Sequence, residues 1–548
     1  MNATVSPRFI APDNAPVQAA LAALGDLPGI EPLPAISMQA DGRLLIIGET
    51  GVAQGWAERL AGQRTVTVLA VGQSAAVNPE NDPNFEIYPA SQIRLSGHLG
   101  AFEVQWQAAG QAMRAHFDVV LDLSPSPLIN RVELPTGYLA AGRDPLEQAL
   151  AIIDLLAFDG EFEKPRYVAV NERVCAHSRS QKAGCSNCLE VCSTEAITGA
   201  GDTIKLDPYL CQGCGSCTTV CPSGALSFQY PRVADLGLAI KAQLKAYRLA
   251  GGLAPALLFH SGTAGSKALL ASQMAGHALP AQFIPVEIWS ADAVGLDLLL
   301  GAIALGACQV AVLGAGSHDL APLRRQASLG QAILNGLGYT GDHLRIVDTE
   351  RSDWLAALAD WPQPAAVPAA EFRLLADKRT TLEFVIDHLA RHAPTPVDAI
   401  ELPAGSPFGT ITVSDACTLC MSCTSACPAS ALKAASDAPR LSFIERNCVQ
   451  CGLCANTCPE QAIALTPRLL VKDRRHERLL REAEIFCCTS CGKPMGAAPT
   501  ILSMIGKLSS HSMFATPEAK ARLSMCGDCR VIDLINNEPS TKAWEMSE

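Results

Sequence analysis

The sequence is poor in charged and aromatic side chains, and it has no long polar tracts. Charged residues make up 18% and aromatic residues 5% of its 548 residues, against 49% hydrophobic residues. A mainly disordered chain is therefore excluded, because ample apolar surface is available for burial. The first residues show no charged leader followed by an apolar core, so we expect no secretory signal. The net charge of −12 repels phosphate backbones and argues against nucleic-acid binding.

Familiar catalytic motifs are also missing. We find no Ser/His/Asp constellation, no phosphate-binding loop and no H-E-x-x-H pattern. The turn at 48–55 contains glycines but lacks the G-x-G-x-x-G order, which favours a packing turn over a flavin or nicotinamide site. One uncharged run, 298–316, is just long enough to span a membrane. Its glycines and Gln309 favour a helix followed by a buried strand, so we predict no membrane span.

Cysteine, in contrast, is abundant, with 22 residues. Two blocks hold eight cysteines each, five more lie near the C-terminus, and Cys308 stands alone in an apolar run that predicts a core position. So many thiols in a chain without an export signal indicate a reducing compartment and metal ligands, not disulfides. We therefore expect a cytoplasmic metalloprotein.

The two blocks contain internal repeats. Three stretches, 211–228, 417–434 and 448–465, share the pattern C-x2-C-x2-C-x3-C-P. A fourth copy begins at Cys185, and its leading cysteine, Cys175, lies before a nine-residue insert, AHSRSQKAG. This spacing places three thiolates on one tight loop, while the fourth, expected at the start of a helix, points to a second cluster.

These blocks resemble bacterial two-cluster ferredoxins, and two such modules make the chain similar to a polyferredoxin. The resemblance implies four [4Fe–4S] clusters, because neighbouring loops exchange their fourth ligands. The expected ligand sets are Cys175, Cys185, Cys188 with Cys221; Cys211, Cys214, Cys217 with Cys192; Cys417, Cys420, Cys423 with Cys458; and Cys448, Cys451, Cys454 with Cys427. The insert leaves an alternative of three clusters plus a labile or [3Fe–4S] site in the Cys175 set. The basic side chains of the insert could raise the redox potential of the Cys175 cluster or steer an acidic redox partner. The alternative is that the insert is a solvated loop.

The C-terminal cysteines follow another pattern. Two C-x2-C pairs, Cys488 with Cys491 and Cys526 with Cys529, predict a tetrahedral four-sulfur site for structural zinc. Iron in the same shell and a redox dithiol are the alternatives, and Cys487 is expected to be a spectator. The run 472–482 predicts a basic helix, either a solvated face or a docking patch for an acidic partner.

The region between the two blocks predicts alternating strands and helices. Its stretch 289–348, with His318-Asp319 and Arg324-Arg325, resembles the delta-subunit domain of methyl-viologen-reducing hydrogenases. The cluster-binding cysteines of that family are absent here, so the resemblance implies fold and docking role without a fifth cluster. The whole arrangement is also similar to cytoplasmic 4Fe-4S proteins associated with bacterial formate dehydrogenases.

We predict a mixed fold, α/β plus α+β, in which two α/β units alternate with two dicluster ferredoxin-like modules and a zinc-knuckle tail follows. The expected segments are a lead-in with one short helix (1–38), an α/β unit (39–165), the first module (166–232), the second α/β unit (233–375), a linker helix (376–410), the second module (411–470), and a basic helix with the tail (471–548).

The expected function is electron transfer through up to four [4Fe–4S] clusters between redox proteins such as a dehydrogenase, a hydrogenase or a small electron carrier. One alternative is a flavin- or NAD-dependent oxidoreductase subunit that uses the N-terminal α/β unit. Another is a maturation factor for a metalloenzyme. We expect an electron-transfer protein or oxidoreductase subunit more than a complete enzyme.

Overall fold

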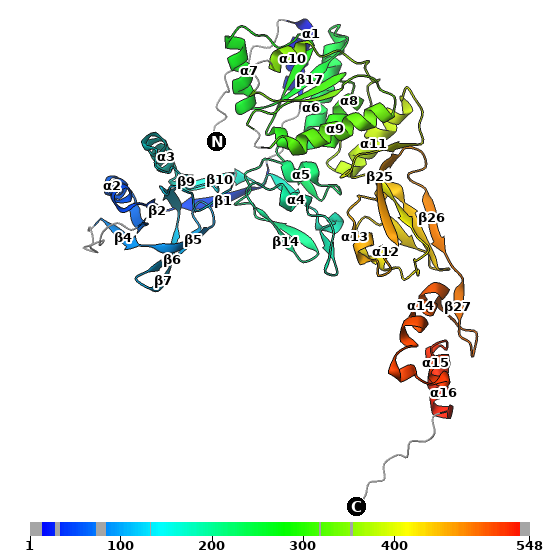
Figure 1. The fold of residues 1–548 in the computed structure, drawn as a ribbon. Coiled ribbons are helices and arrows are strands. Elements are labelled where there is room, and N and C mark those ends of the chain that lie inside the picture. The colour runs from blue at the N-terminus through cyan, green and yellow to red at the C-terminus, as the bar shows by residue number, and fades with distance from the viewer. Residues whose placement is uncertain are drawn as a thin grey trace, which may run out of the picture.

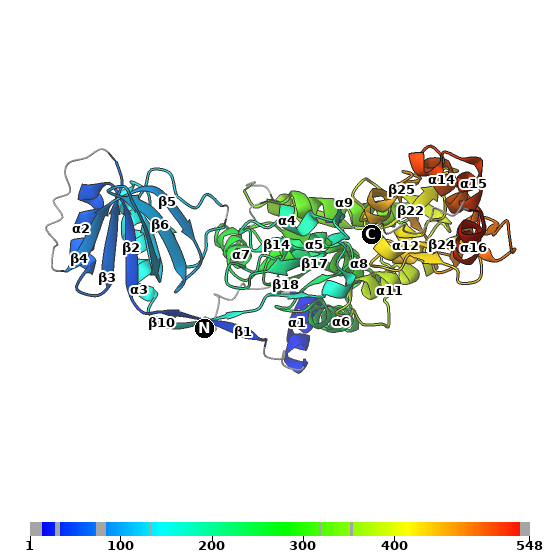
Figure 2. The ribbon, with the colours of Figure 1, turned by 90° about the horizontal axis from the view of Figure 1, so that it is seen from below.

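A computed structural model describes residues 14–27, 33–72, 84–131, 133–316, 319–350 and 354–537. Figure 1 shows an N-terminal lobe beside a larger body, with the C-terminal tail extending from the lower end of that body. Seen from below in Figure 2, the lobe and the tail lie at opposite ends of the molecule. Among the described residues, no helix is both long and apolar enough to cross a membrane.

The N-terminal lobe is built on a parallel sheet with the strand order β4-β3-β2-β8-β9. Its strands are β2 (Arg43–Gly48), β3 (Thr65–Ala70), β4 (Phe85–Pro89), β8 (Val119–Asp122) and β9 (Tyr138–Ala140). One face, with Leu44 and Ile46, packs under helices α2 (Thr50–Leu60) and α3 (Pro145–Ala157). Both faces are covered, as a parallel sheet requires.

An antiparallel sheet covers the other face of the lobe, where Leu45 and Ile47 are buried. It consists of β5 (Ser91–Ser96), β6 (Phe102–Ala108) and β7 (Gln111–Phe117). A tight turn at Ala109 and Gly110, both with positive φ, pairs β6 with its sequence neighbour β7.

A two-stranded ribbon, β1 (Ala35–Ala40) with β10 (Gly160–Pro165), leads from the lobe into the first ferredoxin module. The module has short antiparallel pairs and two short helices. They are β11 (Val168–Val170) with β16 (Leu226–Phe228), β12 (Ser178–Arg179) with β13 (Lys182–Ala183), β14 (Ile197–Ala200) with β15 (Thr203–Leu206), α4 (Asn187–Glu190) and α5 (Ser216–Val220).

The second α/β unit has a parallel sheet in the order β18-β17-β19-β20. The strands are β17 (Ala256–Ser261), β18 (Phe283–Ile288), β19 (Gln309–Leu313) and β20 (Leu344–Val347). The sequence pattern predicted all four. The apolar run 298–316 contains most of α8 (Leu296–Ala304) and β19, both buried, which confirms the prediction of a helix followed by a strand. Cys308 is buried in the same core region, and His318 lies outside the described residues.

The helices of this unit come from distant parts of the chain. They are α6 (Val233–Leu249), α7 (Ala264–Met274), α8, α9 (Ala321–Gly336) and α10 (Trp354–Ala359), joined by α1 (Ala15–Ala22) and α11 (Lys378–Arg391). The lead-in helix α1 buries Val17 and Ala20 in the core of this unit, and α11 buries Leu382 and Val385 there. The predicted linker helix is thus a core element.

The second ferredoxin module contains two three-stranded sheets and two short helices. The sheets are β21-β25-β22 and β23-β24-β26, with β21 (Ala399–Glu401), β22 (Gly409–Val413), β23 (Leu432–Ala434), β24 (Arg440–Ile444), β25 (Ile463–Leu470) and β26 (Glu477–Glu482), and the helices are α12 (Ser422–Ala426) and α13 (Leu453–Thr457).

The predicted basic helix 472–482 is not a helix, because its second half is strand β26, which adds to the edge of β24. Arg474 pairs with Glu383 at 3.3 Å and also with Asp387, both on α11, and Arg481 pairs with Asp415 at 2.9 Å. Partners elsewhere in the chain therefore hold these arginines in an extended segment. They occupy neither a solvated helix face nor an open docking patch.

The tail follows as a small hairpin and three helices. The elements are β27 (Ile485–Cys487), β28 (Pro494–Ala497), α14 (Ala498–Leu508), α15 (Pro517–Arg522) and α16 (Gly527–Asn537). It contacts the second module through a hydrogen bond from Thr500 Oγ1 to the Thr418 carbonyl and an ion pair between Lys507 and Glu460 at 2.8 Å.

Candidate metal centres

The three regular cysteine loops share one backbone form. Each has a left-handed residue directly before its second cysteine, at Gly213, Leu419 and Gln450. Each has another directly after its second cysteine, at Gly215, Met421 and Gly452. Such turns direct successive backbone N–H groups to one side, where they can face anionic sulfur. A left-handed backbone conformation is energetically unfavourable for Leu, Met and Gln. Contacts around the loops must therefore stabilise this shape where glycine is absent.

The fourth cysteine of each loop lies at the end of a short helix. Cys221, Cys427 and Cys458 are the residues that directly follow α5, α12 and α13. The expectation that the fourth cysteine starts a helix is therefore wrong. Each helix instead contains the third cysteine and ends directly before the fourth, because an x3 spacing covers about one helical turn.

In the first module, the structure brings together the residues of the Cys175 set. Burial raises the pKa of Cys185 to about 11 and of Cys188 to about 12, and the adjacent Cys221 and Cys175 thiolates raise both. The Cys211 set also converges. Burial raises the pKa of Cys217 well above its ordinary value, and Cys214, Cys211 and Cys192 raise it further. Ligand binding at such thiols releases protons, because the thiolate is the ligand.

The second module repeats this arrangement. In the Cys417 set, burial raises the pKa of Cys423 to about 12, with added contributions from Cys417, Cys420 and Cys458. In the Cys448 set, burial raises the pKa of Cys454 to about 12, with contributions from Cys448, Cys451 and Cys427. In each predicted set the four cysteines thus lie close enough to influence one another's pKa, and their role as cluster ligands stays a prediction.

Cysteines of different predicted sets also lie near one another. In the first module, the negative charge of Cys188 raises the pKa of Cys217, a member of the other set. In the second module, Cys423 raises the pKa of Cys454 in the same way. Cys185 of the first module raises the pKa of Cys451 of the second module. These pairs connect the predicted sets in the order Cys211, Cys175, Cys448 and Cys417.

The nine-residue insert makes the contact between the modules. It forms the hairpin β12–β13, and Asn456 Nδ2 of α13 donates a hydrogen bond to the Ala183 carbonyl at 2.8 Å. Leu453 is fully buried in this contact, and a Cβ on Gly184 would lie 2.7 Å from Leu453 Cγ. The insert 176–184 was predicted to be a solvated or partner-steering loop, but part of it contacts the second module and forms the joint between the two modules.

Two adjacent residues of α11, which sequence reasoning missed, hold both modules. Lys378 Nζ donates to the carbonyls of Thr218, Thr219 and Cys221 at 3.0, 2.8 and 3.2 Å. Arg379 Nη2 donates to the Cys448 carbonyl at 3.2 Å, and burial lowers the pKa of Arg379. No local pattern could reveal this role, because Lys378 is 157 positions from Cys221.

The tail cysteines Cys488, Cys491, Cys526 and Cys529 converge, with all four sulfurs within 4.8 Å of one another. The sulfurs of Cys491 and Cys526 are 3.7 Å apart, close to the edge of about 3.8 Å of a tetrahedron with Zn–S bonds of about 2.3 Å. The Cys526 N–H donates to Cys488 Sγ at 3.2 Å and lowers the pKa of that thiol to about 6. Cys487 stands outside the group and is exposed.

Comparisons with known proteins agree with the cysteine pattern. Residues 183–225 and 416–463 each match a 4Fe-4S dicluster domain family. These matches support an iron–sulfur protein with ferredoxin-like 4Fe-4S domains and an electron-transfer role. Hydrogenase-4 component A of Escherichia coli (strain K12) is 43% identical over 54 residues, which are 10% of this chain and 24% of that protein. The chain thus matches about a quarter of the length of this relative.

Proposed function

We propose that the protein carries electrons between redox partner proteins through four [4Fe–4S] clusters, one in each cysteine set. When bound, such clusters accept and donate single electrons. The observation that carries the proposal is the contact between the modules at Cys185, Leu453 and Cys451. In our proposal, this contact brings the two modules together so that their ligand sets form one continuous row.

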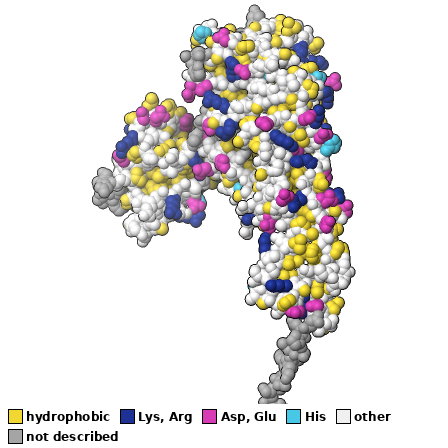
Figure 3. All heavy atoms as spheres, turned by 45° about the vertical axis from the view of Figure 1, so that its right-hand side comes forward, with side chains coloured by type: hydrophobic (Ala, Val, Ile, Leu, Met, Phe, Trp, Pro, Cys, Tyr) yellow, Lys and Arg dark blue, Asp and Glu magenta, His cyan; other side chains and the backbone are white. Residues whose placement is uncertain are grey.

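The surroundings of the row suggest where partners dock. At one end Cys420 is exposed, whereas at the other end Cys217 is buried under the second α/β unit. An exposed ligand loop lets a partner approach closely, so we propose that one partner docks at the Cys417 set. Acidic and basic side chains are interspersed on the face drawn in Figure 3, which favours a partner recognised by shape and mixed charge.

The two cluster-free α/β units are proposed to position partner enzymes of the dehydrogenase or hydrogenase class, formate dehydrogenases among them. We place the protein in the cytoplasm, where thiols stay reduced. In the tail, the four converging cysteines fit a structural zinc ion. Such a site would stabilise helices α14 and α16, whose side chains Leu502 and Ile535 are exposed.

The alternative of a dinucleotide site in the N-terminal lobe is less well supported. Its strand order, β4-β3-β2-β8-β9, is compatible with dinucleotide binding. However, Glu49 stands at the start of α2, where a pyrophosphate would lie, and forms an ion pair with Arg143. A carboxylate at this position repels phosphate, so we keep electron transfer as the proposal.

The deciding experiment is metal and sulfide analysis of the full chain purified without oxygen, with EPR spectra of the reduced protein. We expect about 16 Fe with matching sulfide, about one Zn, and spin coupling between neighbouring clusters. About 12 Fe would restrict the proposal to three clusters and identify the Cys175 set as incomplete. Iron below about 8 would contradict a continuous row.

A further inference from the structure

Lys378 and Arg379, at the start of α11, bring two half-buried positive charges into contact with the two modules. Every hydrogen bond that their side chains donate in the described structure goes to a backbone carbonyl. Among the residues that the structure describes, neither side chain forms a salt bridge. Glu383 of the same helix pairs with Arg474, and Asp377 caps the start of the helix. Half-buried charge without a counter-charge is unfavourable, so a structural clamp does not by itself explain these two cations.

Each of the two cations reaches a residue that is expected to bind a cluster. Lys378 Nζ donates to the carbonyl of Cys221, the expected fourth ligand of the Cys175 set, at 3.2 Å. Arg379 Nη2 donates to the carbonyl of Cys448, in the neighbouring set, at 3.2 Å. Burial lowers the pKa of Arg379, and the Cys448 thiolate is among the groups that oppose this lowering. The two cations therefore lie beside the two sets that meet at the joint between the modules.

An iron–sulfur cluster is a counter-charge that suits these positions. Four thiolate ligands make each cluster site anionic, and reduction of the cluster adds one more negative charge. The attraction to a neighbouring cation is therefore stronger in the reduced state than in the oxidised state. Because the charge around a cluster is one of the properties that set its potential, a cation at this place raises the reduction potential.

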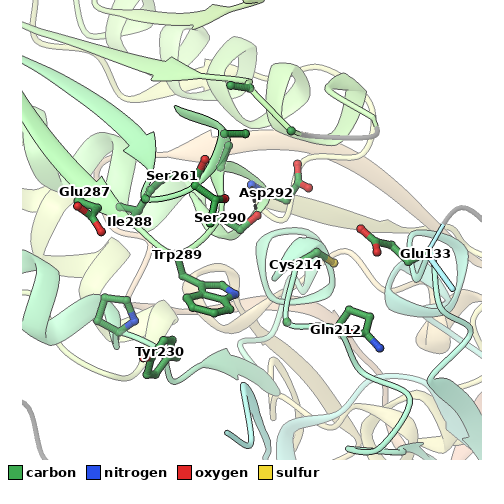
Figure 4. Close-up of a pocket in the computed structure, with 18 of the residues that line it drawn as sticks. Glu133, Gln212, Cys214, Tyr230, Ser261, Glu287, Ile288, Trp289, Ser290 and Asp292 are labelled. Atoms are coloured by element: carbon green, nitrogen blue, oxygen red, sulfur yellow. Dashed lines mark hydrogen bonds between the residues drawn. The ribbon is translucent and has the colours of Figure 1, made fainter. Parts of the chain in front are cut away.

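The Cys211 set, at one end of the row, has a different electrostatic environment. Burial raises the pKa of Cys214 in this set, and Asp292 raises it further. Figure 4 shows both residues at a cavity of about 830 Å³ between the first module and the second α/β unit. The lining of this cavity contains no Lys or Arg among the described residues, and its carboxylates are those of Glu133, Glu287 and Asp292. Lys164 is a cation near Cys211, but burial lowers its pKa. Positive charge without an acidic partner is therefore concentrated at the joint and not at every set.

We propose that Lys378 and Arg379 raise the reduction potentials of the two clusters at the joint, those of the Cys175 and Cys448 sets. Both residues are positioning residues, because they act on the clusters through their charge and bind no electron-transfer partner. Electrons that enter the row then collect at the joint between the modules. The inference rests on the proposed function, which places clusters in these sets, and it extends that function by assigning two side chains to the control of their potentials.

The test is a redox titration of the full chain, purified without oxygen and followed by EPR. The signals are assigned to clusters by their loss in Cys175→Ser and Cys454→Ser. Lys378→Gln should lower the potential of the Cys175 cluster, and Arg379→Gln should lower that of the Cys448 cluster. We expect each reduction equilibrium to shift about tenfold, which is about 59 mV for one electron. Lys378→Arg and Arg379→Lys keep the positive charge, so both should keep the wild-type potentials.

Lys245→Gln is the matched control, because it removes the charge of an exposed lysine near the C-terminal end of α6 in the same α/β unit. It should leave every potential unchanged. Iron content is measured on the same samples, and where one of the Gln variants at α11 loses its cluster, the potential of the other decides.

Three results would each overturn the inference and leave the two residues as structural clamps only. They are unchanged potentials in both Gln variants at α11, equal shifts in the charge-keeping and charge-removing variants, and loss of about 4 Fe from both Gln variants. Full iron in the wild type would leave the proposed function standing in all three cases. A wild-type chain without bound iron would instead overturn the proposed function and the inference with it.

Discussion

The two ferredoxin modules carry the same cysteine pattern in different surroundings. The first is enclosed, since Thr219 Oγ1 donates to the Asp292 carbonyl of the second α/β unit at 2.6 Å and Lys378 holds the Cys221 carbonyl. The second lies towards the tail and exposes Cys420. The comparison teaches that the repeat specifies the ligand sets, whereas the flanking units decide which set is buried, which is exposed and which meets the other module.

The largest expected effect comes from breaking the row within the second module. Cys454→Ser should remove about 4 Fe and weaken the neighbouring set, because Cys427, expected to bind the same cluster, belongs to the loop of the Cys417 set. Iron analysis and EPR of the variant measure this loss. Cys487→Ser, an exposed cysteine outside every set, is the control and should keep the wild-type iron content. Unchanged iron in Cys454→Ser would show that the ligand assignment is wrong.

The same substitution in the first module tests whether the irregular set is equivalent. Cys175→Ser should also remove about 4 Fe, because the structure places Cys175 with Cys185, Cys188 and Cys221. The effect on the second module should be smaller, since its sets do not use Cys175. If iron and EPR signals match those of the wild type, the Cys175 set holds no cluster and the two modules differ in cofactor content.

The joint between the modules is tested by Leu453→Ala. This change removes a fully buried side chain that packs against Gly184, so it should destabilise the protein by about 2–5 kcal/mol. The melting temperature of the cluster-loaded protein measures the effect. Leu479→Ala, at a side chain 51% exposed in the same module, should change stability by no more than about 0.5 kcal/mol. Equal melting temperatures for the two variants would mean that the joint contributes little.

The smallest effect on the cluster row is expected at the tail. Combined Cys526→Ser and Cys529→Ser should release about one Zn and leave the iron content intact, because the tail cysteines lie outside the four sets. Metal analysis of the purified variant gives both values. A loss of iron would identify the tail as an iron site and would extend the row beyond the second module.

Much of the fold follows from local sequence patterns. Alternating strands and helices of both α/β units, helix α11 and the buried Cys308 were predicted, because apolar periodicity and burial depend on near neighbours. Strand β26 was not, since its charged sequence favours a helix until Arg474 and Arg481 find partners on distant segments. The same reason explains the core role of α11, which the sequence presents only as an amphipathic helix between two domains.

The sequence by itself indicated which thiols share a loop, through the x2 and x3 spacings, and the resemblance to two-cluster ferredoxins predicts how the loops exchange their fourth ligands. The tertiary structure decided which of these groups of cysteines lie close to one another and which residues hold the two modules together. Cys185 and Cys451 come together only because the insert hairpin packs on α13, and Lys378 and Arg379 reach both modules only because α11 is buried in the second α/β unit. The cavity beside Cys214 arises in the same way. These contacts join residues far apart in the chain, and packing between domains leaves no periodic signal in the sequence.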